Sequence, residues 1–519
     1  MSEDLSSVVK GSARGSLFLM AGQVVGTVVS AVTVILVARM LGSELYGRIA
    51  IAMIPVSLAL LLQNLGVSTA LMRFSSRFRR EGRTAELRML VSTGLIFSAS
   101  VALLLSAVLF IFAGPVSAVW LRRPDLESLV RVASLQILGQ ALLTSIQAVL
   151  IGFELMSFHA ASQVAWSILR GLIVFPLILV GFGAYGPVVA VAVSSLLVGL
   201  ACVLLFFRRV KFSVEAGSAG FSGSLRLILS FGLPLYVGSL VSGGLSQVYG
   251  TLMATSVSTE LIGNYSAATN FTVLVGFFTM PISLTLFPLF SKMDRFDPGL
   301  EALFQNAVKY TNMVVTPIAA CLILVSAPMT GIIYGDGYPY ASLYLSLLLI
   351  LYLFEGLGGT SLGNLILGLG ETRVIFNANV IQLLVGVPLS LVLVPRFQIV
   401  GLIASMIIAP LVSLLYLLIW LGKSTGFMIK LGDSARVYLC TLAAFMISYL
   451  MLSLLHLDGW VALLSCGSLF FSAYVVALPL SGALDRSGTR QLSELVGATG
   501  PLAPVLRVVL SLMDRLMRK

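Results

Sequence analysis

The chain has 519 residues, of which 58% are hydrophobic and 10% are charged, and its formal net charge is +11. Soluble domains carry about a quarter charged residues, so this composition excludes a soluble globular protein and predicts a polytopic membrane protein. Most apolar runs reach the roughly 20 residues that a helix needs to cross the bilayer, whereas strands of alternating polarity are absent, which excludes a transmembrane barrel.

The apolar runs predict an all-α fold with about fourteen transmembrane helices. The first six are expected at 16–38, 48–72, 89–113, 129–151, 160–182 and 187–207. Six more are expected at 227–254, 264–290, 309–334, 340–366, 374–394 and 399–421. The last two are expected at 436–455 and 460–482.

These helices and their connections divide the chain into five predicted parts. They are an N-terminal six-helix bundle (1–207), a cytoplasmic linker (208–226), a C-terminal six-helix bundle (227–421), two additional transmembrane helices (422–482) and a cytoplasmic amphipathic tail (483–519). In the tail, apolar residues follow one side of residues 501–518 and basic or polar residues the other, which predicts a helix lying on the anionic inner leaflet. The alternative is a cytoplasmic helix docked against the protein itself.

A short polar turn between the first two apolar runs occurs a second time in the chain. The turn spans 38–47 and its counterpart spans 254–263, so that Gly47 matches Gly263 at an offset of 216 positions. Further matches at this offset pair Ala38 with Ala254, Glu44 with Glu260, Leu45 with Leu261 and Gly152 with Gly368. An offset that holds over a long distance predicts two copies of one unit. The alternative is two unrelated apolar halves, because small residues in apolar sequence often match by chance.

The distribution of basic residues predicts the orientation in a cell membrane, either plasma or inner. Loops rich in Lys and Arg stay on the cytoplasmic side, and the termini with the even-numbered loops hold about 25 of the 32 basic residues. Both termini are therefore expected in the cytoplasm, which requires an even number of spans. Six helices per copy is also even, so the two copies would form a parallel repeat.

No constellation of residues typical of an enzyme appears in the sequence, and neither a metal nor a cofactor is expected. The residues from Gly422 to Thr425 end like a phosphate-binding loop, but Leu417 stands where the first glycine should be. The cysteines lie in apolar runs without CxxC spacing and are interpreted as small buried hydrophobes: Cys202, Cys321, Cys440 and Cys466.

Polar residues inside the predicted helices are the candidates for a substrate cavity, because they are costly in hydrocarbon and usually face protein or water. Gln23, Thr27 and Ser30 share one face of the first helix. The seventh helix repeats this pattern with Ser239, Ser242, Ser246 and Gln247, and Asn64 and Asn270 add amides in the second and eighth helices. The alternative is that the hydroxyl residues merely allow helices to pack closely.

Arginines within or beside the spans are the second group of candidates. Arg170 lies near the middle of the fifth helix and should face a cavity, a partner or an anionic ligand, and Glu355 in the tenth helix is a possible partner or coupling residue. Arg14 and Arg73 lie at helix ends, where reaching toward the interface is the ordinary explanation. A functional interpretation makes Arg14, Arg73 and Arg170 a positive lining for a phosphate group.

The turn from Ala38 to Gly47, with Arg39, Gly42, Tyr46 and Gly47, and the later glycines Gly152 and Gly186 resemble those of the polysaccharide flippases in the multidrug/oligosaccharidyl-lipid/polysaccharide exporter superfamily. The resemblance extends over almost the whole chain. It implies two six-helix bundles around a central cavity and movement of a polyprenyl-linked oligosaccharide from the inner to the outer leaflet by alternating access. The implied partners are this lipid, the bilayer and glycan-assembly enzymes, with no nucleic acid.

Two other functions remain open from the sequence. One is an ion-coupled multidrug antiporter of the same superfamily, which the absence of Asp and Glu from residues 16–38 disfavours, although Glu355 could still couple protons. The other is a membrane-embedded glycosyltransferase or polymerase acting on a similar lipid. Such enzymes usually have large outer loops with catalytic charges, whereas the predicted outer loops here are short and carry few charges.

Overall fold

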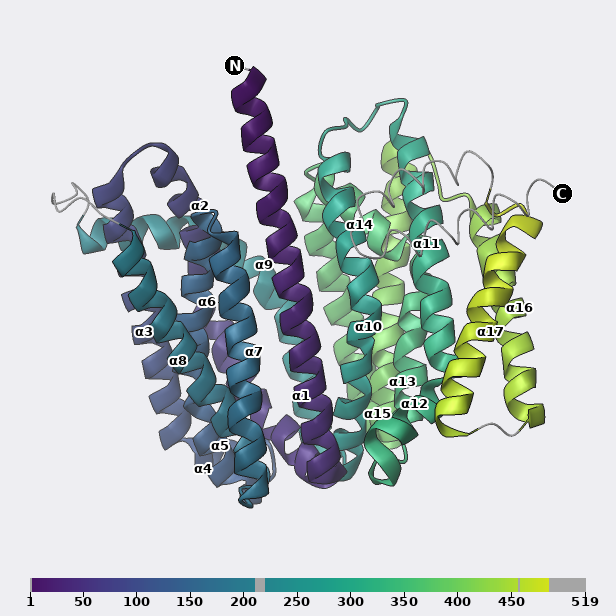
Figure 1. Ribbon diagram of the computed structural model, residues 1–519, viewed down its shortest axis with the longest axis horizontal. Helices are drawn as coiled ribbons and strands as arrows, with labels where there is room; N and C mark the ends of the chain where they lie inside the picture. Colours follow the sequence, from purple (N-terminus) through teal and green to yellow (C-terminus); the bar gives the residue numbers. More distant parts are fainter. Residues whose placement is uncertain (1, 211–219, 456–457, 485–519) are drawn as a thin grey trace. The chain divides into compact units, whose positions relative to one another are not determined.

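The computed structural model describes residues 2–210, 220–455 and 458–484, and for residues 2–21, 23, 235, 238 and 242 the backbone alone. In these ranges every regular element is a helix (Figure 1), which confirms the all-α prediction. The helices of the first half are α1 (Ser2–Asn64), α2 (Val67–Arg80), α3 (Thr84–Ile111), α4 (Ala113–Pro115), η1 (Val116–Trp120), η2 (Pro124–Leu126), α5 (Glu127–Ser134), α6 (Gln136–Gly152), α7 (Met156–Leu179), α8 (Tyr185–Arg209) and α9 (Phe221–Ser256). Those of the second half are α10 (Thr259–Phe290), α11 (Leu300–Leu324), α12 (Ser326–Tyr334), η3 (Gly335–Gly337), α13 (Ala341–Leu349), η4 (Ile350–Leu357), α14 (Gly359–Gly368), α15 (Thr372–Thr425), α16 (Leu431–Leu455) and α17 (Gly459–Leu480).

Ten of the described helical segments are long and apolar enough to cross a membrane, or up to 12 if each of two bent pairs is one span. The chain is therefore a multi-pass membrane protein. The two longest helices are interrupted, α1 at Gly42 with φ 75° and α15 at Gln398 with φ 52°. At 1.5 Å per residue, the 63 residues of α1 would otherwise extend about three times the thickness of the hydrocarbon core.

The prediction of a single helix at 48–72 is wrong. The helix ends at Asn64, Leu65 and Gly66 adopt positive φ angles of 42° and 75°, and α2 begins at Val67. The physical reason is a close backbone contact, because a Cβ at Gly66 would lie 2.1 Å from the carbonyl oxygen of Gly232. In the same way the range 309–334 divides into α11 and α12, and the range 340–366 is broken at Gly358.

The described residues form two compact units. Unit 1 comprises Met1–Ser266 with Ser390–Ile399, and unit 2 comprises Ala267–Leu389 with Val400–Lys519. The predicted tail helix at 501–518 and the middle of the predicted linker lie outside the described residues, while the linker ends fall within α8 and α9.

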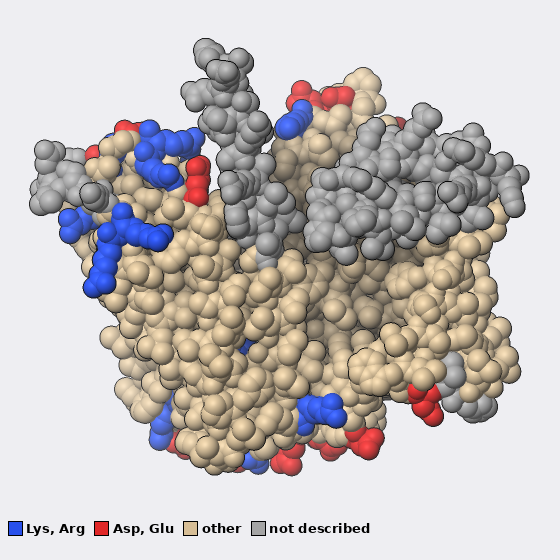
Figure 2. Space-filling model, in the orientation of Figure 1, with Lys and Arg blue, Asp and Glu red and all other residues tan. Residues whose placement is uncertain are grey.

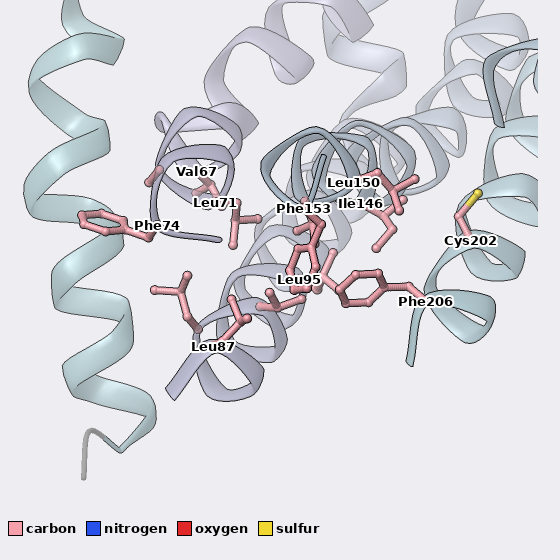
Figure 3. Close-up of a cluster of buried hydrophobic side chains, with 14 of the residues drawn as sticks. Val67, Leu71, Phe74, Leu87, Leu95, Ile146, Leu150, Phe153, Cys202 and Phe206 are labelled. Carbon is pink, nitrogen blue, oxygen red and sulfur yellow. The ribbon is translucent and has the colours of Figure 1, made fainter. Parts of the chain in front are cut away.

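The core of unit 1 joins α2, α3, α6, α8 and α9 (Figure 3). Leu71 from α2, Leu90 from α3 and Ile146 from α6 are almost completely buried in it. Phe206 from α8 meets Phe153 edge-on, with ring centroids 4.9 Å apart. The apolar contacts of this cluster hold α2 against α6 and thereby fix one wall of the unit.

The cores of unit 2 are built in two clusters. One joins α10, α11, α14 and α15 around Phe290 and Phe304. The other packs the last two helices, α16 and α17, on α11, where the hydroxyl of Tyr474 donates a hydrogen bond of 2.8 Å to the carbonyl oxygen of Met313. All the cysteines are buried and free, as predicted from their apolar surroundings.

Candidate functional site

The candidate site begins at a tight contact between α1 and α7 in unit 1. A Cβ at Gly22 would lie 2.3 Å from the Cβ of Ala160, and a Cβ at Gly26 would lie 3.1 Å from Cγ of Gln163. The hydroxyl of Ser167 donates a hydrogen bond of 3.0 Å to the carbonyl oxygen of Gly26. Small residues let helix backbones approach closely in a membrane. The contacts of Gly22 and Gly26 with α7 therefore position the polar groups that follow on the same two helices.

Arg170 lies one turn beyond Trp166 on α7. Its Nη1 donates to the hydroxyl of Ser30 on α1 at 3.5 Å, and its guanidinium carbon lies 5.7 Å from the centroid of the Trp166 ring. An arginine side chain has five N–H donors, and within the described part of the chain only this one long hydrogen bond uses any of them. A cation inside a membrane span with unused donors is suited to an anionic ligand.

Glutamines and hydroxyl groups extend the polar interior of unit 1. The amide of Gln147 on α6 donates to Gln163 Oε1 at 3.0 Å and to Ser162 Oγ at 3.1 Å, and the amide of Gln140 donates to Gln136 Oε1 at 3.2 Å. These glutamines were not among the residues predicted from the sequence. The signal was present, because Gln136, Gln140, Thr144 and Gln147 are spaced by four, four and three residues and therefore share one helix face.

The structure places the predicted cavity residues in different surroundings. Thr27 and Ser30 are half-buried on α1, and Gln247 on α9 accepts a hydrogen bond of 3.1 Å from the hydroxyl of Ser57. Asn64, in contrast, is exposed at the end of α1 and accepts a hydrogen bond of 3.5 Å from the backbone N–H of Ser68. The side chains of three predicted residues lie outside the described residues: Arg14, Gln23 and Ser242.

Arg73 lies at one end of unit 1 rather than beside Arg170. It is exposed on α2, and its guanidinium lies 4.2 Å from the centroid of the Phe231 ring. Other exposed arginines share this end, where Figure 2 shows basic side chains in a group: Arg77, Arg79, Arg80, Arg83 and Arg88. Hydrogen bonds from Arg77 and Arg83 lower the pKa of Glu81 in the connection between α2 and α3.

In unit 2, Glu355 lies at a break in a helix. It is buried at the end of η4, and its carboxylate accepts from the hydroxyl of Thr360 at 2.7 Å and from the backbone N–H of Thr360 at 2.9 Å. Gly358 between them has φ 81°, and the two helical arms are bent by 54°. The carboxylate therefore satisfies a backbone donor in the first turn of α14. Asn270, also in unit 2, donates to the hydroxyl of Tyr334 at 3.2 Å.

The predicted hairpins contact each other within unit 1. A Cβ at Gly47 would lie 1.9 Å from the carbonyl oxygen of Thr259, and a Cβ at Gly263 would lie 1.8 Å from that of Ser43. Both pairs are related by the offset of 216 positions, so the contact is reciprocal, as in an interface with twofold symmetry. Within the first hairpin, Arg39 is exposed, Tyr46 is half-buried and Gly42 forms the break in α1.

Arg123, in the segment that precedes α5, donates hydrogen bonds to the second hairpin. Its guanidinium donates to the carbonyl oxygen of Val257 at 2.6 Å and reaches that of Ala254 and the hydroxyl of Thr259 at 3.3 Å each. In residues 2–210, 220–455 and 458–484, no three His, Cys, Asp or Glu side chains are grouped so as to hold a metal ion.

A family model described as "Polysaccharide biosynthesis protein" matches residues 36–342. The chain belongs to the polysaccharide biosynthesis protein family. A second model, described as "Lipid II flippase MurJ", matches residues 229–471. No curated protein sequence is significantly similar to the chain.

Solved structures with the same fold include lipid II flippase MurJ in an inward closed conformation, with a TM-score of 0.72 and 16% sequence identity over 89% of this chain and 98% of that one. An inward-facing multidrug resistance transporter of the MATE family matches with a TM-score of 0.62 and 17% identity over 77% of this chain and 94% of that one. A transporter from Pyrococcus furiosus matches with a TM-score of 0.53 and 18% identity over 80% and 96%.

These matches confirm the resemblance to polysaccharide exporters. The chain has the fold of the MOP superfamily, to which the MATE and Pyrococcus furiosus transporters belong. It is similar to the lipid II flippase MurJ in both sequence pattern and fold. A transporter needs a polar path through the bilayer, and the polar side chains between α1, α6 and α7 are the candidates for part of it.

Proposed function

We propose that this protein flips a polyprenyl-linked oligosaccharide, a precursor of a polysaccharide or related glycan, from the inner to the outer leaflet by alternating access and without altering it chemically. The observation that carries the proposal is Arg170, a cation within a membrane span, in a chain of the polysaccharide biosynthesis protein family. A sugar–phosphate headgroup cannot enter hydrocarbon without substitutes for its water. The lipid tail of the substrate can remain in the bilayer throughout.

Arg170 and the polar side chains of α6 and α7 match the two parts of such a headgroup. The guanidinium has donors left for phosphate oxygens, to which its planar fork is suited. Gln140, Gln147 and Gln163 carry amides that both donate and accept, so they can exchange hydrogen bonds with sugar hydroxyls. Thr27, Ser30 and Gln247 from the first and seventh predicted spans would extend the same lining, and Arg14, Gln23, Asn64, Arg73 and Asn270 remain proposed members of it.

We propose fourteen spans in two parallel six-helix copies followed by two extra helices, with both termini in the cytoplasm. The interruptions at Gly42 and Gln398 support two crossings in each of α1 and α15. The reciprocal contact between Gly47 and Gly263 supports the duplication. The group of exposed arginines on α2 and α3 supports a cytoplasmic location for that end of unit 1.

The proposal is tested by deleting the gene in its native cell. A lipid-linked oligosaccharide should then accumulate on the cytoplasmic leaflet, where mass spectrometry identifies its glycan and its lipid. Restoring the wild-type protein should remove the accumulation, whereas an Arg170→Gln variant expressed at the same level should not. A lipid of altered mass would indicate a glycosyltransferase or polymerase. Unchanged lipid-linked sugars together with greater sensitivity to cationic drugs would indicate an antiporter.

A further inference from the structure

A second site of unit 1 lies at the end opposite to the arginines of α2. A cavity of about 480 Å³ opens there between the first hairpin, the start of α5 and the connection from α7 to α8. The second arm of α1, residues 43–64, leads from this end to the α2 end and is about 33 Å long, which is close to the thickness of the hydrocarbon core. If α2 is cytoplasmic, as proposed, this cavity faces the outside of the cell.

The polar wall of the cavity holds groups that can both donate and accept hydrogen bonds. Nη2 of Arg48 lies 3.5 Å from Oδ2 of Asp125, and the side chains are 40% and 53% exposed, so both remain accessible to a ligand. The hydroxyl of Tyr185 lies 2.6 Å from that of Ser128. A carboxylate accepts, a guanidinium donates and a phenol does both, which are the bonds that vicinal sugar hydroxyls require.

The facing wall is apolar. Phe182 is 48% exposed and Val180 is 75% exposed, and both belong to a connection in which Gly181 and Gly183 have positive φ angles of 95° and 50°. These glycines allow the sharp turn that presents the aromatic ring beside the polar wall. A pyranose ring has an apolar C–H face and a polar edge, so it can use both walls together. A volume of about 480 Å³ lies in the ordinary range for small-molecule sites.

The charges of the cavity favour the neutral sugars of a glycolipid headgroup over its phosphate groups. Arg48 is shared by two carboxylates, Asp125 at 3.5 Å and Glu44 at 3.8 Å. One cation with two anions leaves this wall net negative, which repels a phosphate and tolerates a neutral polyol. We propose that this cavity is a saccharide-binding site for the neutral sugars of the transported headgroup after they reach the outer side. The inference rests on the proposed function for its source of saccharide.

The test uses an engineered cysteine at the rim, because the native cysteines are buried and leave the wild type as a blank. Val180→Cys protein in vesicles is labelled with a membrane-impermeant maleimide, with and without lactose, N,N′-diacetylchitobiose or inorganic pyrophosphate. Leu454→Cys is the matched control, because Leu454 is 74% exposed at the end of α16 in unit 2, outside the cavity. At about three times its Kd a saccharide should slow labelling of Cys at 180 about fourfold and leave the control unchanged.

Second substitutions in the Val180→Cys protein connect the protection to the walls of the cavity. Asp125→Asn replaces a charged acceptor by a neutral amide and Tyr185→Phe removes a hydroxyl, each at nearly constant size, and either should reduce the protection by saccharide. The inference is overturned if neither disaccharide slows labelling, or if pyrophosphate protects as well as they do. It is also overturned if the cysteine reacts in detergent but not in vesicles, because the loop then lies in the bilayer.

Transport measured in the same vesicles separates the two proposals. Movement of a lipid-linked oligosaccharide without protection by saccharides would refute the saccharide-binding site and leave the flippase proposal intact. Protection by saccharides without such movement would support the saccharide-binding site and refute the flippase proposal. Both results together support the cavity as a site for the sugar part of the substrate.

Discussion

The two halves of the chain are alike at their hairpins and different in their interiors. Gly47 and Gly263 take equivalent parts in one reciprocal contact. At or near the offset that relates them, however, Arg170 corresponds to the uncharged pair at 385–386, and Glu355 corresponds to Gly139. A close contact between backbones tolerates no side chain in either half. An interior polar group can differ between the halves, because each has partners on its own helices.

The likeness of the hairpins predicts the largest effect on stability. Gly47→Ala or Gly263→Ala would place a Cβ within 2 Å of a carbonyl oxygen, and the backbones must move apart. We expect each to lower the free energy of unfolding by about 3 kcal/mol, measured by SDS titration in mixed micelles. Gly244→Ala is the control, because a Cβ there meets nothing within 4 Å, and it should stabilise by about 0.5–1 kcal/mol. Unequal losses of unfolding free energy in Gly47→Ala and Gly263→Ala would show that the two hairpins do not contribute equally to their contact.

The difference between the interiors predicts a loss of transport at Arg170. Arg170→Gln keeps a donor for Ser30 but removes the charge, and a hydrogen bond to a charged group contributes about 1.5–3 kcal/mol. Flipping of a lipid-linked oligosaccharide should therefore fall about 10- to 100-fold, while Arg170→Lys retains part of it. Arg88→Gln, an exposed arginine at the start of α3, should transport at the wild-type rate. If transport falls in both Arg170→Gln and Arg88→Gln, the cause is the lower net charge of the protein rather than the position of Arg170.

Glu355 should act mainly on stability instead. Glu355→Gln weakens the bonds from the N–H and hydroxyl of Thr360, so unfolding should require about 2 kcal/mol less free energy, measured by the same titration. Glu371→Gln is the matched control, because Glu371 forms a partly exposed ion pair with Arg295 and should change stability by less than about 1 kcal/mol. If transport by folded Glu355→Gln protein falls as much as in Arg170→Gln, the distinction between the two interiors fails.

Glu81 provides the smallest effect, because its side chain is at the surface. Hydrogen bonds from Arg77 and Arg83 lower its pKa below the ordinary 4.5, so they contribute to stability above the pKa of the unfolded chain. The contribution is lost as the pH falls through the lower pKa of the folded state. Carbon-13 NMR of the carboxyl should show titration below 4.5, moving toward 4.5 in Arg77→Gln, and Glu81→Gln should slightly lower the free energy of unfolding at pH 7. A carboxyl that titrates at 4.5 in the wild type would contradict this.

The long helices could be predicted from the sequence because apolar length alone decides them. Periodicity also placed Ser30 on a polar face, and the position of Arg170 near the middle of the fifth predicted helix identified it as an interior cation. The breaks at Gly66 and Gly358 could not be predicted in this way, since each depends on a contact with another helix or on a cap that only the folded chain supplies. Gly66 turns where it meets the backbone of Gly232.

The bonding partners of Arg170 and Glu355 could not be predicted from the sequence either. A cation and an anion in separate spans suggested a pair, but Glu355 is bonded by Thr360 five residues away, and Arg170 by Ser30 on another helix. The glutamines of α6 carried a readable spacing, yet a row of amides in an apolar helix does not reveal which neighbour it faces. Local patterns therefore identified several site residues and could not assemble them.

The most direct test of the account is flipping by the purified protein in vesicles. A polyprenyl-linked oligosaccharide is placed in the inner leaflet, and an added glycosidase that cannot cross the membrane reports its arrival in the outer leaflet. We predict arrival that depends on the protein, is about 10- to 100-fold slower in Arg170→Gln, and leaves the mass of the lipid unchanged before glycosidase is added. Arrival at the same rate in empty vesicles and in those with wild-type protein would contradict the account.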